Sequence, residues 1–347
     1  MPDSTASHVE ERRPILVTGG AGYIGSHVVK LLGERGERVV VLDDLSSGNA
    51  EAVLHGELVV GGTGDRALVT DLLRAHGIDS VMHFAAHTVV PESVGDPLKY
   101  YRNNTASTLA LLEACADAGV DKLIFSSTAA TYGIPADAAR PTDEDTPTAP
   151  INPYGQSKLM SEGMIRDLST AGALRHVILR YFNVAGSDPD GLIGQSSRDA
   201  TLLIKVAAEV ALGRRERLVV YGTDFPTPDG TGVRDYIHVT DLAHAHLAAL
   251  DHLRGGGESA LLNCGYGRGY SVREVIDAVS RAIGRPLPAV EEARRPGDPP
   301  ALVAAVGRIG ETLGWRPRHD DLDFIVRTSL EWERTLLERD AKGERAA

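Results

Sequence analysis

The chain has 347 residues, a length that predicts a large hydrophobic core and two lobes. Its composition is that of an ordinary globular protein, with 42% hydrophobic and 24% charged residues, and no apolar stretch approaches the ~20 residues of a membrane-spanning helix. The formal net charge of −12 argues against a general nucleic-acid binder, so we expect neither nucleic acid nor membrane among its partners.

The N-terminal residues 1–13 are polar and lack an apolar signal core, so we expect a loose tail there. The chain has two cysteines, Cys115 and Cys264, in segments that read as a helix and a strand. Buried, reduced thiols and a cytoplasmic location are the favoured interpretation. We expect no metal site.

The first apolar run, Ile15–Thr18, leads directly into the glycine-rich residues 19–25 and then into a helical pattern. Glycines let the backbone turn sharply and approach a pyrophosphate, whose charge is met by the helix N-terminus. A second apolar run, residues 39–42, ends in Asp43, close to the ~20-residue separation expected for a carboxylate that binds ribose hydroxyls. An ordinary glycine-rich turn is the alternative, but the combined pattern favours a dinucleotide. Asp43 would repel a 2′-phosphate, which favours NAD over NADP.

Strands and helices then alternate. Three further strands are expected over residues 58–60, 81–84 and 122–125. A helix is predicted over residues 98–118, where Leu109 and Leu112 recur at helical spacing. After a proline-rich loop, another helix begins near Pro153, and residues 177–181 read as a sixth strand. This alternation predicts an α/β fold with a Rossmann-type, doubly wound parallel sheet.

Beyond about residue 186, glycines and charges interrupt shorter elements, which predicts a smaller C-terminal α/β lobe. Helices are expected over residues 201–212 and 324–339, and a strand over 218–221. Ser271 and Glu274 form a capping box for a helix that ends near residue 283. Residues 235–265, including a strand at 236–238, are expected to return to the main sheet.

Tyr154 and Lys158 lie four residues apart near the start of a predicted helix, so they share one face. A phenol with a pKa near 10 is a poor base at neutral pH, but an ammonium and the positive charge of oxidised nicotinamide favour the phenolate. Such a pair can take a proton from an alcohol while its carbon gives a hydride to the cofactor. A surface Tyr and Lys on an amphipathic helix is the alternative interpretation.

Ser126, Ser127 and Thr128 directly follow the fifth strand. In a parallel sheet, ligands bind at the carboxyl ends of the strands. A hydroxyl at this point can share the hydrogen bond between the phenol and a substrate oxygen. The alternative for Thr128 is a helix or turn cap.

From Ile15 to about Trp332 the chain resembles the extended short-chain dehydrogenase/reductase family, and within it the UDP-glucose 4-epimerases. The motifs that carry the resemblance are residues 18–27, 43–45, 83–85, 100–104, 125–133, 152–158, 180–183, 230–238 and 294–300. The resemblance implies an isomerase that interconverts UDP-galactose and UDP-glucose, with NAD as a tightly bound cofactor. It also implies an NAD-binding domain over residues 14–185 and a nucleotide-sugar-binding lobe mainly over 186–340.

The family's mechanism implies a role for each residue of the catalytic group. Tyr154 would take the proton from the 4-hydroxyl of the sugar while carbon 4 gives its hydride to NAD. Lys158 would lower the pKa of Tyr154 and hold the nicotinamide ribose, and Thr128 would bridge the substrate and the phenol. The 4-keto sugar then turns over and receives the hydride on its other face.

The resemblance also implies the binding residues. Those for NAD are Gly19, Gly22, Tyr23, Ile24, Gly25, Asp43, Asp44, Phe84, Ala85, Asn103, Ser126, Tyr154, Lys158 and Tyr181. Those for the UDP-sugar are Thr128, Tyr154, Asn183, Leu203, Arg234, Arg295 and Asp298. The two arginines would meet the pyrophosphate and Asp298 the uridine ribose, although solvated arginines are the commoner case. A homodimer packed through the 98–118 helix and the Tyr154 helix is implied.

Several positions depart from the family pattern. Gly62 stands where an Asp usually meets the adenine, and residues 84–88 lack a lysine that some relatives use for the cofactor. Leu202 replaces a His or Asn near the diphosphate, and we hypothesise that Lys205 partly restores that polar contact. Leu302, at the position that gates sugar size, is intermediate in bulk. UDP-N-acetylglucosamine and UDP-xylose or UDP-arabinose therefore stay open as alternative substrates.

Two other classes share this fold. Nucleotide-sugar 4,6-dehydratases place Asp-Glu after the strand-end hydroxyl, whereas Thr128 is followed here by Ala129 and Ala130, which argues against dehydration. A non-catalytic NAD-binding sensor would be expected to lose the Tyr or the Lys, and this chain keeps both.

Overall fold

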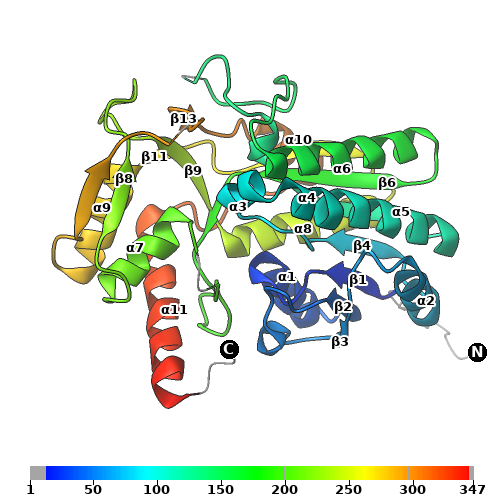
Figure 1. Ribbon diagram of the computed structural model, residues 1–347. Coiled ribbons are helices and arrows are strands. Elements are labelled where there is room, and N and C mark those ends of the chain that lie inside the picture. The colour runs from blue at the N-terminus through cyan, green and yellow to red at the C-terminus, as the bar shows by residue number, and fades with distance from the viewer. Residues whose placement is uncertain (1–12, 139, 198–199, 296, 344–347) are drawn as a thin grey trace, which may run out of the picture.

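The computed structural model describes residues 13–138, 140–197, 200–295 and 297–343. The tail expected over residues 1–13 therefore lies outside the described residues except for Arg13. A layered α/β body and a smaller lobe lie side by side (Figure 1). Within the described residues, no helix combines the length and the apolar character that crossing a membrane requires.

The central feature is a seven-stranded sheet in which every pairing is parallel, with the order β10-β6-β5-β4-β1-β2-β3. Its strands are β1 (Ile15–Thr18), β2 (Val39–Asp43), β3 (Glu57–Val60), β4 (Ser80–His83), β5 (Lys122–Thr128), β6 (Arg175–Tyr181) and β10 (Ala260–Cys264). The predicted doubly wound sheet is confirmed. Because β1 lies between β2 and β4, the strand order reverses there, and ligands bind outside the carboxyl ends of strands at such a point.

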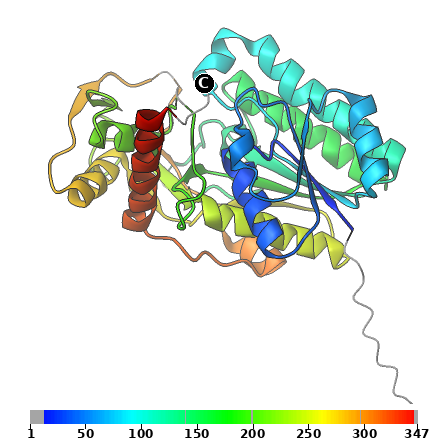
Figure 2. The same ribbon diagram turned by 90° about the horizontal axis from the view of Figure 1, so that it is seen from below.

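Helices cover both faces of this sheet because neighbouring residues of a buried strand point to opposite sides. Ile15 and Val17 belong to the core beneath α1 (Tyr23–Glu34) and α8 (Val239–Arg254). Leu16 belongs to the core on the other face. The helices of that other face are α2 (Arg66–His76), α5 (Ser107–Ala118) and α6 (Pro153–Thr170). Both layers are visible edge-on in Figure 2.

The helix expected over residues 98–118 is interrupted. It consists of α4 (Pro97–Tyr100), a π-helical turn (Tyr101–Ala106) and α5, and α3 (Val90–Gly95) precedes it. Single π-helical turns occur often at functional sites. Asn104 in this turn is buried, accepts from the His87 N–H at 2.9 Å and donates to the His87 carbonyl at 3.0 Å. The turn therefore fixes the loop that follows β4.

The smaller lobe has its own apolar core beneath α7 (Leu203–Ala211), α9 (Val272–Ile283) and α11 (Leu322–Lys342). Its strands are β7 (Asn183–Ala185), β8 (Leu218–Tyr221), β9 (Val233–His238), β11 (Gly269–Ser271), β12 (Ala289–Glu292) and β13 (Ala301–Leu302). The predicted capping box is confirmed, because the Ser271 side chain accepts from the Glu274 N–H and Glu274 accepts from the Ser271 N–H. A short helix, α10 (Gly307–Leu313), packs against β10 and α8.

The sequence predicts that the strand around Tyr236 returns to the main sheet, but in the structure it does not. Strand β9 pairs instead with β7, β11 and β13 in a four-stranded sheet. The physical reason is that β7 follows β6 after one residue, Phe182, so the strand that pairs with β7 lies beyond the carboxyl end of the main sheet. Residues of β10 do join the main sheet, next to β6.

A buried ion pair joins three elements near the carboxyl ends of β5 and β6. Glu162 of α6 is 0% exposed and Arg180 of β6 is 3% exposed. Arg180 donates twice to this carboxylate, Nε to Oε1 at 2.9 Å and Nη2 to Oε2 at 2.6 Å, and the Ser127 hydroxyl also donates to it. Removing one partner of such a pair leaves an uncompensated buried charge.

We predict that Arg180→Met lowers the free energy of unfolding by about 3–5 kcal/mol, because Glu162 is left buried without its fork of donors. The double variant Arg180→Met/Glu162→Met should be destabilised less than the single one. Thermal unfolding followed by circular dichroism measures both. Arg66→Gln, which removes an exposed ion pair with Asp117, is the control and should leave the melting temperature unchanged. A single variant no less stable than the double one would contradict the prediction.

Candidate active site

The glycine-rich loop connects β1 to α1 through close backbone contacts. Gly19 has φ +71°, and a Cβ on it would lie 2.5 Å from the Ala85 backbone nitrogen. A Cβ on Gly25 would lie 2.2 Å from the Gly19 carbonyl oxygen. Gly22 is the N-cap of α1 and makes no side-chain cap hydrogen bond, so the first turn offers backbone donors and the positive end of the helix dipole. This loop fits a dinucleotide pyrophosphate.

Asp43 at the end of β2 is buried and braces this loop. Its Oδ2 accepts from the Ala21 N–H and its Oδ1 from the Leu45 N–H, both at 2.9 Å. Burial raises the pKa of the Asp43 carboxyl, and the two hydrogen bonds oppose the shift. Asp44 is exposed and accepts from Ser46. Asp43 thus has a structural task in addition to the ribose contact expected of it.

The predicted catalytic residues lie together at the carboxyl end of β5. The side chain of the α6 N-cap, Asn152, accepts from the Gly155 N–H at 2.8 Å and so fixes where the helix begins. Tyr154 is 8% exposed and Lys158 is 3% exposed. The Lys158 ammonium donates to the Ser126 carbonyl at 2.8 Å and lies 4.9 Å from the centre of the Phe125 ring.

Burial dominates the titration of this group. It lowers the pKa of the Lys158 ammonium to about 7, with Glu162 opposing the shift. It also raises the pKa of the Tyr154 phenol above its ordinary value, and a hydrogen bond with Thr128 opposes that shift. In the protein alone the pKa of Tyr154 is therefore raised, and the lowering expected from Lys158 stays a prediction. The net shift has the opposite direction because desolvation disfavours both charged forms.

Thr128 combines the two roles considered for it. Its Oγ1 accepts from the Ala130 N–H at 3.1 Å and so caps a short 3₁₀ turn (Ala129–Thr131). The same hydroxyl is hydrogen-bonded to Tyr154. Capping uses an acceptor site of the hydroxyl and leaves its proton for donation.

Other expected cofactor residues surround this group. The Ser126 and Tyr181 hydroxyls are hydrogen-bonded to each other at the ends of β5 and β6. Asn103, in the π-helical turn, is half-buried and donates to the Asn104 side chain at 3.2 Å. Phe84 directly follows β4, and its ring centre lies 4.7 Å from that of His246.

The expected substrate residues fall into two groups. Asn183 and Leu203, together with Leu202, line a small pocket in the smaller lobe. Arg234 of β9 instead forms an ion pair with Asp298, with 3.1 Å between Nη2 and Oδ1. The remaining arginine, Arg295, stacks over the Tyr221 ring at 3.8 Å. Leu302 of β13 is paired in register with Arg234.

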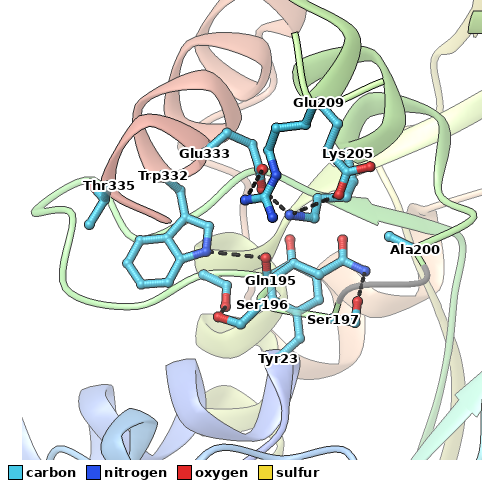
Figure 3. A network of polar contacts seen from close by, with 12 residues as sticks. Tyr23, Gln195, Ser196, Ser197, Ala200, Lys205, Glu209, Trp332, Glu333 and Thr335 are labelled. Atoms are coloured by element: carbon cyan, nitrogen blue, oxygen red, sulfur yellow. Dashed lines mark hydrogen bonds and ion pairs between the residues drawn. The ribbon is translucent and has the colours of Figure 1, made fainter. Parts of the chain in front are cut away.

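Lys205 lines the same pocket as Asn183 but is directed at two carboxylates. It is 6% exposed and forms ion pairs with Glu333 of α11 and, at 3.4 Å, with Glu209. Figure 3 shows this network between α7 and α11. A diphosphate contact of the kind hypothesised for Lys205 would have to compete with these ion pairs.

Sequence reasoning missed Glu162, Asn104 and Glu333. A signal for Glu162 was present, because it continues the spacing of four that joins Tyr154 to Lys158, and all three lie on the buried face of α6. The partners of Asn104 and Glu333 are distant in the chain, and no local pattern indicates them.

We predict that Lys205→Met lowers the free energy of unfolding by about 3 kcal/mol, because the buried Glu333 carboxylate loses its nearest cation. The double variant Lys205→Met/Glu333→Leu should recover most of the melting temperature. Nucleotide-sugar affinity of the single variant, measured by calorimetry, tests the diphosphate contact. An unchanged affinity would contradict that contact, and an unchanged melting temperature would contradict the structural role.

Comparisons of the sequence and of the structure with known proteins all match epimerases. The sequence pattern of the NAD dependent epimerase/dehydratase family matches residues 15–265. A UDP-glucose 4-epimerase of Azospirillum brasilense is 58% identical over 97% of this chain and 95% of its own length. The crystal structure of UDP-glucose 4-epimerase from Brucella ovis in complex with NAD is similar with a TM-score of 0.89 and 47% identity, over 92% of this chain and 98% of that one. The crystal structure of UDP-glucose 4-epimerase from Bifidobacterium longum in complex with NAD+ and UDP is similar with a TM-score of 0.87 and 39% identity, over 93% of this chain and 98% of that one.

Proposed function

The chain belongs to the NAD dependent epimerase/dehydratase family, and we propose that it is a UDP-glucose 4-epimerase that interconverts UDP-galactose and UDP-glucose with NAD. One observation supports this above all: buried Tyr154, Lys158 and Thr128 lie at the same edge of the sheet as the glycine loop, where a Cβ on Gly19 or Gly25 would collide with backbone atoms. Relatives at high identity over nearly the full chain are enzymes of this activity.

In this reaction Tyr154 takes the proton from the 4-hydroxyl of the sugar and returns it after the sugar has turned. The glycine loop and Lys158 would hold NAD, which would supply the hydride acceptor and donor for carbon 4. Since burial raises the pKa of Tyr154, the phenolate needs a nearby positive charge, which Lys158 and the oxidised nicotinamide supply together. Thr128 holds the phenol of Tyr154 by a hydrogen bond and so orients the phenol's proton toward the substrate oxygen.

We assign cofactor binding to residues 14–185, with a contribution from residues 235–265, and nucleotide-sugar binding mainly to 186–340. The pocket of Asn183 and Leu203 would receive part of the nucleotide sugar. Arg234 and Asp298 are ion-paired with each other, so binding of a diphosphate and a ribose would exchange that pair for contacts with the ligand.

The test is turnover of UDP-galactose, UDP-N-acetylglucosamine and UDP-xylose by the purified protein, with the product epimers resolved. We expect UDP-galactose and UDP-glucose to interconvert without added NAD. An absence of turnover with every UDP-sugar would overturn the proposal and favour a non-catalytic NAD-binding sensor.

We predict that Tyr154→Phe abolishes turnover and keeps bound NAD, because it removes only the hydroxyl that moves the proton. Turnover is measured by product analysis, and bound NAD by absorbance after denaturation. Epimerase activity retained within tenfold of the wild type would contradict the assigned base.

We propose a homodimer, packed through the face that carries α3 to α6. Apolar side chains are exposed there: Val94 at 65%, Leu98 at 67%, Leu109 at 47% and Met160 at 45%. Helices α3, α4 and α6 contact one another, and α5 contacts α6, so these residues lie on neighbouring helices (Figure 1). Exposed apolar surface of this kind marks association sites. We also propose a cytoplasmic location, which the two buried, free cysteines favour.

We predict that Val94→Lys/Leu98→Lys converts the dimer to a monomer in sedimentation velocity, because two lysines would be buried unpaired in the interface. Leu192→Lys is the matched control, since Leu192 is 49% exposed but lies outside this face. A wild-type monomer, or a variant that still sediments as a dimer, would contradict the assignment.

A further inference from the structure

Tyr23 is the first residue of α1, directly after the glycine loop, but its side chain reaches the segment that leads into the smaller lobe. Its hydroxyl donates to the Gly186 carbonyl at 2.6 Å. Burial raises the pKa of the phenol, so it stays protonated and keeps this donor at neutral pH. Figure 3 shows Tyr23 extending from α1 toward Gln195 and the network between α7 and α11.

The segment that receives this hydrogen bond is held on its other side by the smaller lobe. Gly186 directly follows β7, has φ +86°, and a Cβ on it would lie 2.4 Å from Cδ2 of His238. The next residue, Ser187, donates its N–H to the Thr328 hydroxyl of α11 at 3.3 Å. Gly186 and Ser187 are thus clamped between α1 and the elements of the smaller lobe.

A second tie from α1 reaches the same segment. The Lys30 ammonium donates to Asp188 at 2.7 Å and to Asp190 at 2.9 Å, and both Lys30 and Asp188 are buried. Tyr23 and Lys30 are seven residues apart, two helical turns, and therefore lie on the same face of α1. The helix that begins at the cofactor loop is fixed to this segment at two points.

The clamped segment is also one wall of the pocket in the smaller lobe. Asn183, Gly186 and Ser187 line that pocket, and Leu202 and Leu203 line it as well. Any shift of Gly186 relative to α1 would therefore move the pocket relative to the glycine loop.

We propose that Tyr23 is a positioning residue that sets the nucleotide-sugar pocket relative to the cofactor loop, through its hydrogen bond to Gly186. This role rests on the proposed function. Hydride transfer needs reacting atoms about 3–3.5 Å apart, and a misplacement of 1 Å can cost about 100-fold in rate. Tyr23 is the first residue of the helix that follows the cofactor loop, and its hydroxyl holds Gly186 in the wall of the pocket. It therefore couples the position of the cofactor to the position of the nucleotide sugar.

The test is Tyr23→Phe in the NAD-containing protein, because the ring and the backbone donors stay while the hydroxyl is lost. We expect bound NAD to be retained and the Kd for UDP to rise about three- to tenfold, the loss expected of one hydrogen bond. The value of kcat should fall as well, because the sugar is held less well against the cofactor. Lys30→Met removes the other tie and should shift the UDP affinity in the same direction.

Trp315→Phe is the control, because it removes a hydrogen bond of the same kind, from a buried side-chain donor (the Trp315 indole N–H) to the backbone carbonyl of Asp241 at 3.1 Å, outside the pocket lining. It should leave UDP affinity unchanged even where the melting temperature falls. An unchanged Kd for UDP in Tyr23→Phe, or loss of NAD in proportion to UDP affinity, would overturn the positioning role. A wild type that retains NAD but binds no UDP would instead overturn the proposed function.

Discussion

The site depends on a close approach of backbones at the point where the strand order of the main sheet reverses. Gly19 touches the chain that leaves β4 so closely that a single added carbon would collide with Ala85, and Gly25 touches Gly19 in the same way. These two contacts determine where α1 begins and how it is oriented. The reach of Tyr23 and Lys30 toward the smaller lobe follows from that orientation.

Burial is the second constraint, and it acts on acid and base alike. At the end of β5, burial favours the neutral forms of both Tyr154 and Lys158. For the buried Glu162 carboxylate, the two hydrogen bonds from Arg180 offset the cost of burial. The buried charge of Glu162 thus has a counter-ion, whereas the contacts of Tyr154 and Lys158 do not offset the effect of burial on their pKa values. A cationic cofactor placed against that pair would act with little screening, because few water dipoles compete with it.

Local signals in the sequence were sufficient for much of this arrangement. The glycine loop, the spacing of Tyr154 and Lys158, the parallel sheet and the Ser271 capping box each depend on residues close together in the chain. The sheet that takes up β9, the π-helical turn before α5 and the ion pair of Lys205 with Glu333 depend on contacts between distant segments. Propensity and periodicity carry no information about which distant segments meet, so these features could not be predicted from the sequence and are seen only in the folded structure.

The place of β10 in the main sheet, and of α8 against one face of it, has a consequence for how the chain is made. Leu250 and Leu253 of α8 belong to the same core as Ile15 and Val17 of β1, and β10 forms an edge of the sheet next to β6. A ribosome must therefore synthesise nearly three-quarters of the chain, to Arg254, before all of α8 can cover β1, and must reach Cys264 before the sheet has its last strand. Until then the nascent α/β half exposes apolar surface of the kind that chaperones recognise and that drives aggregation.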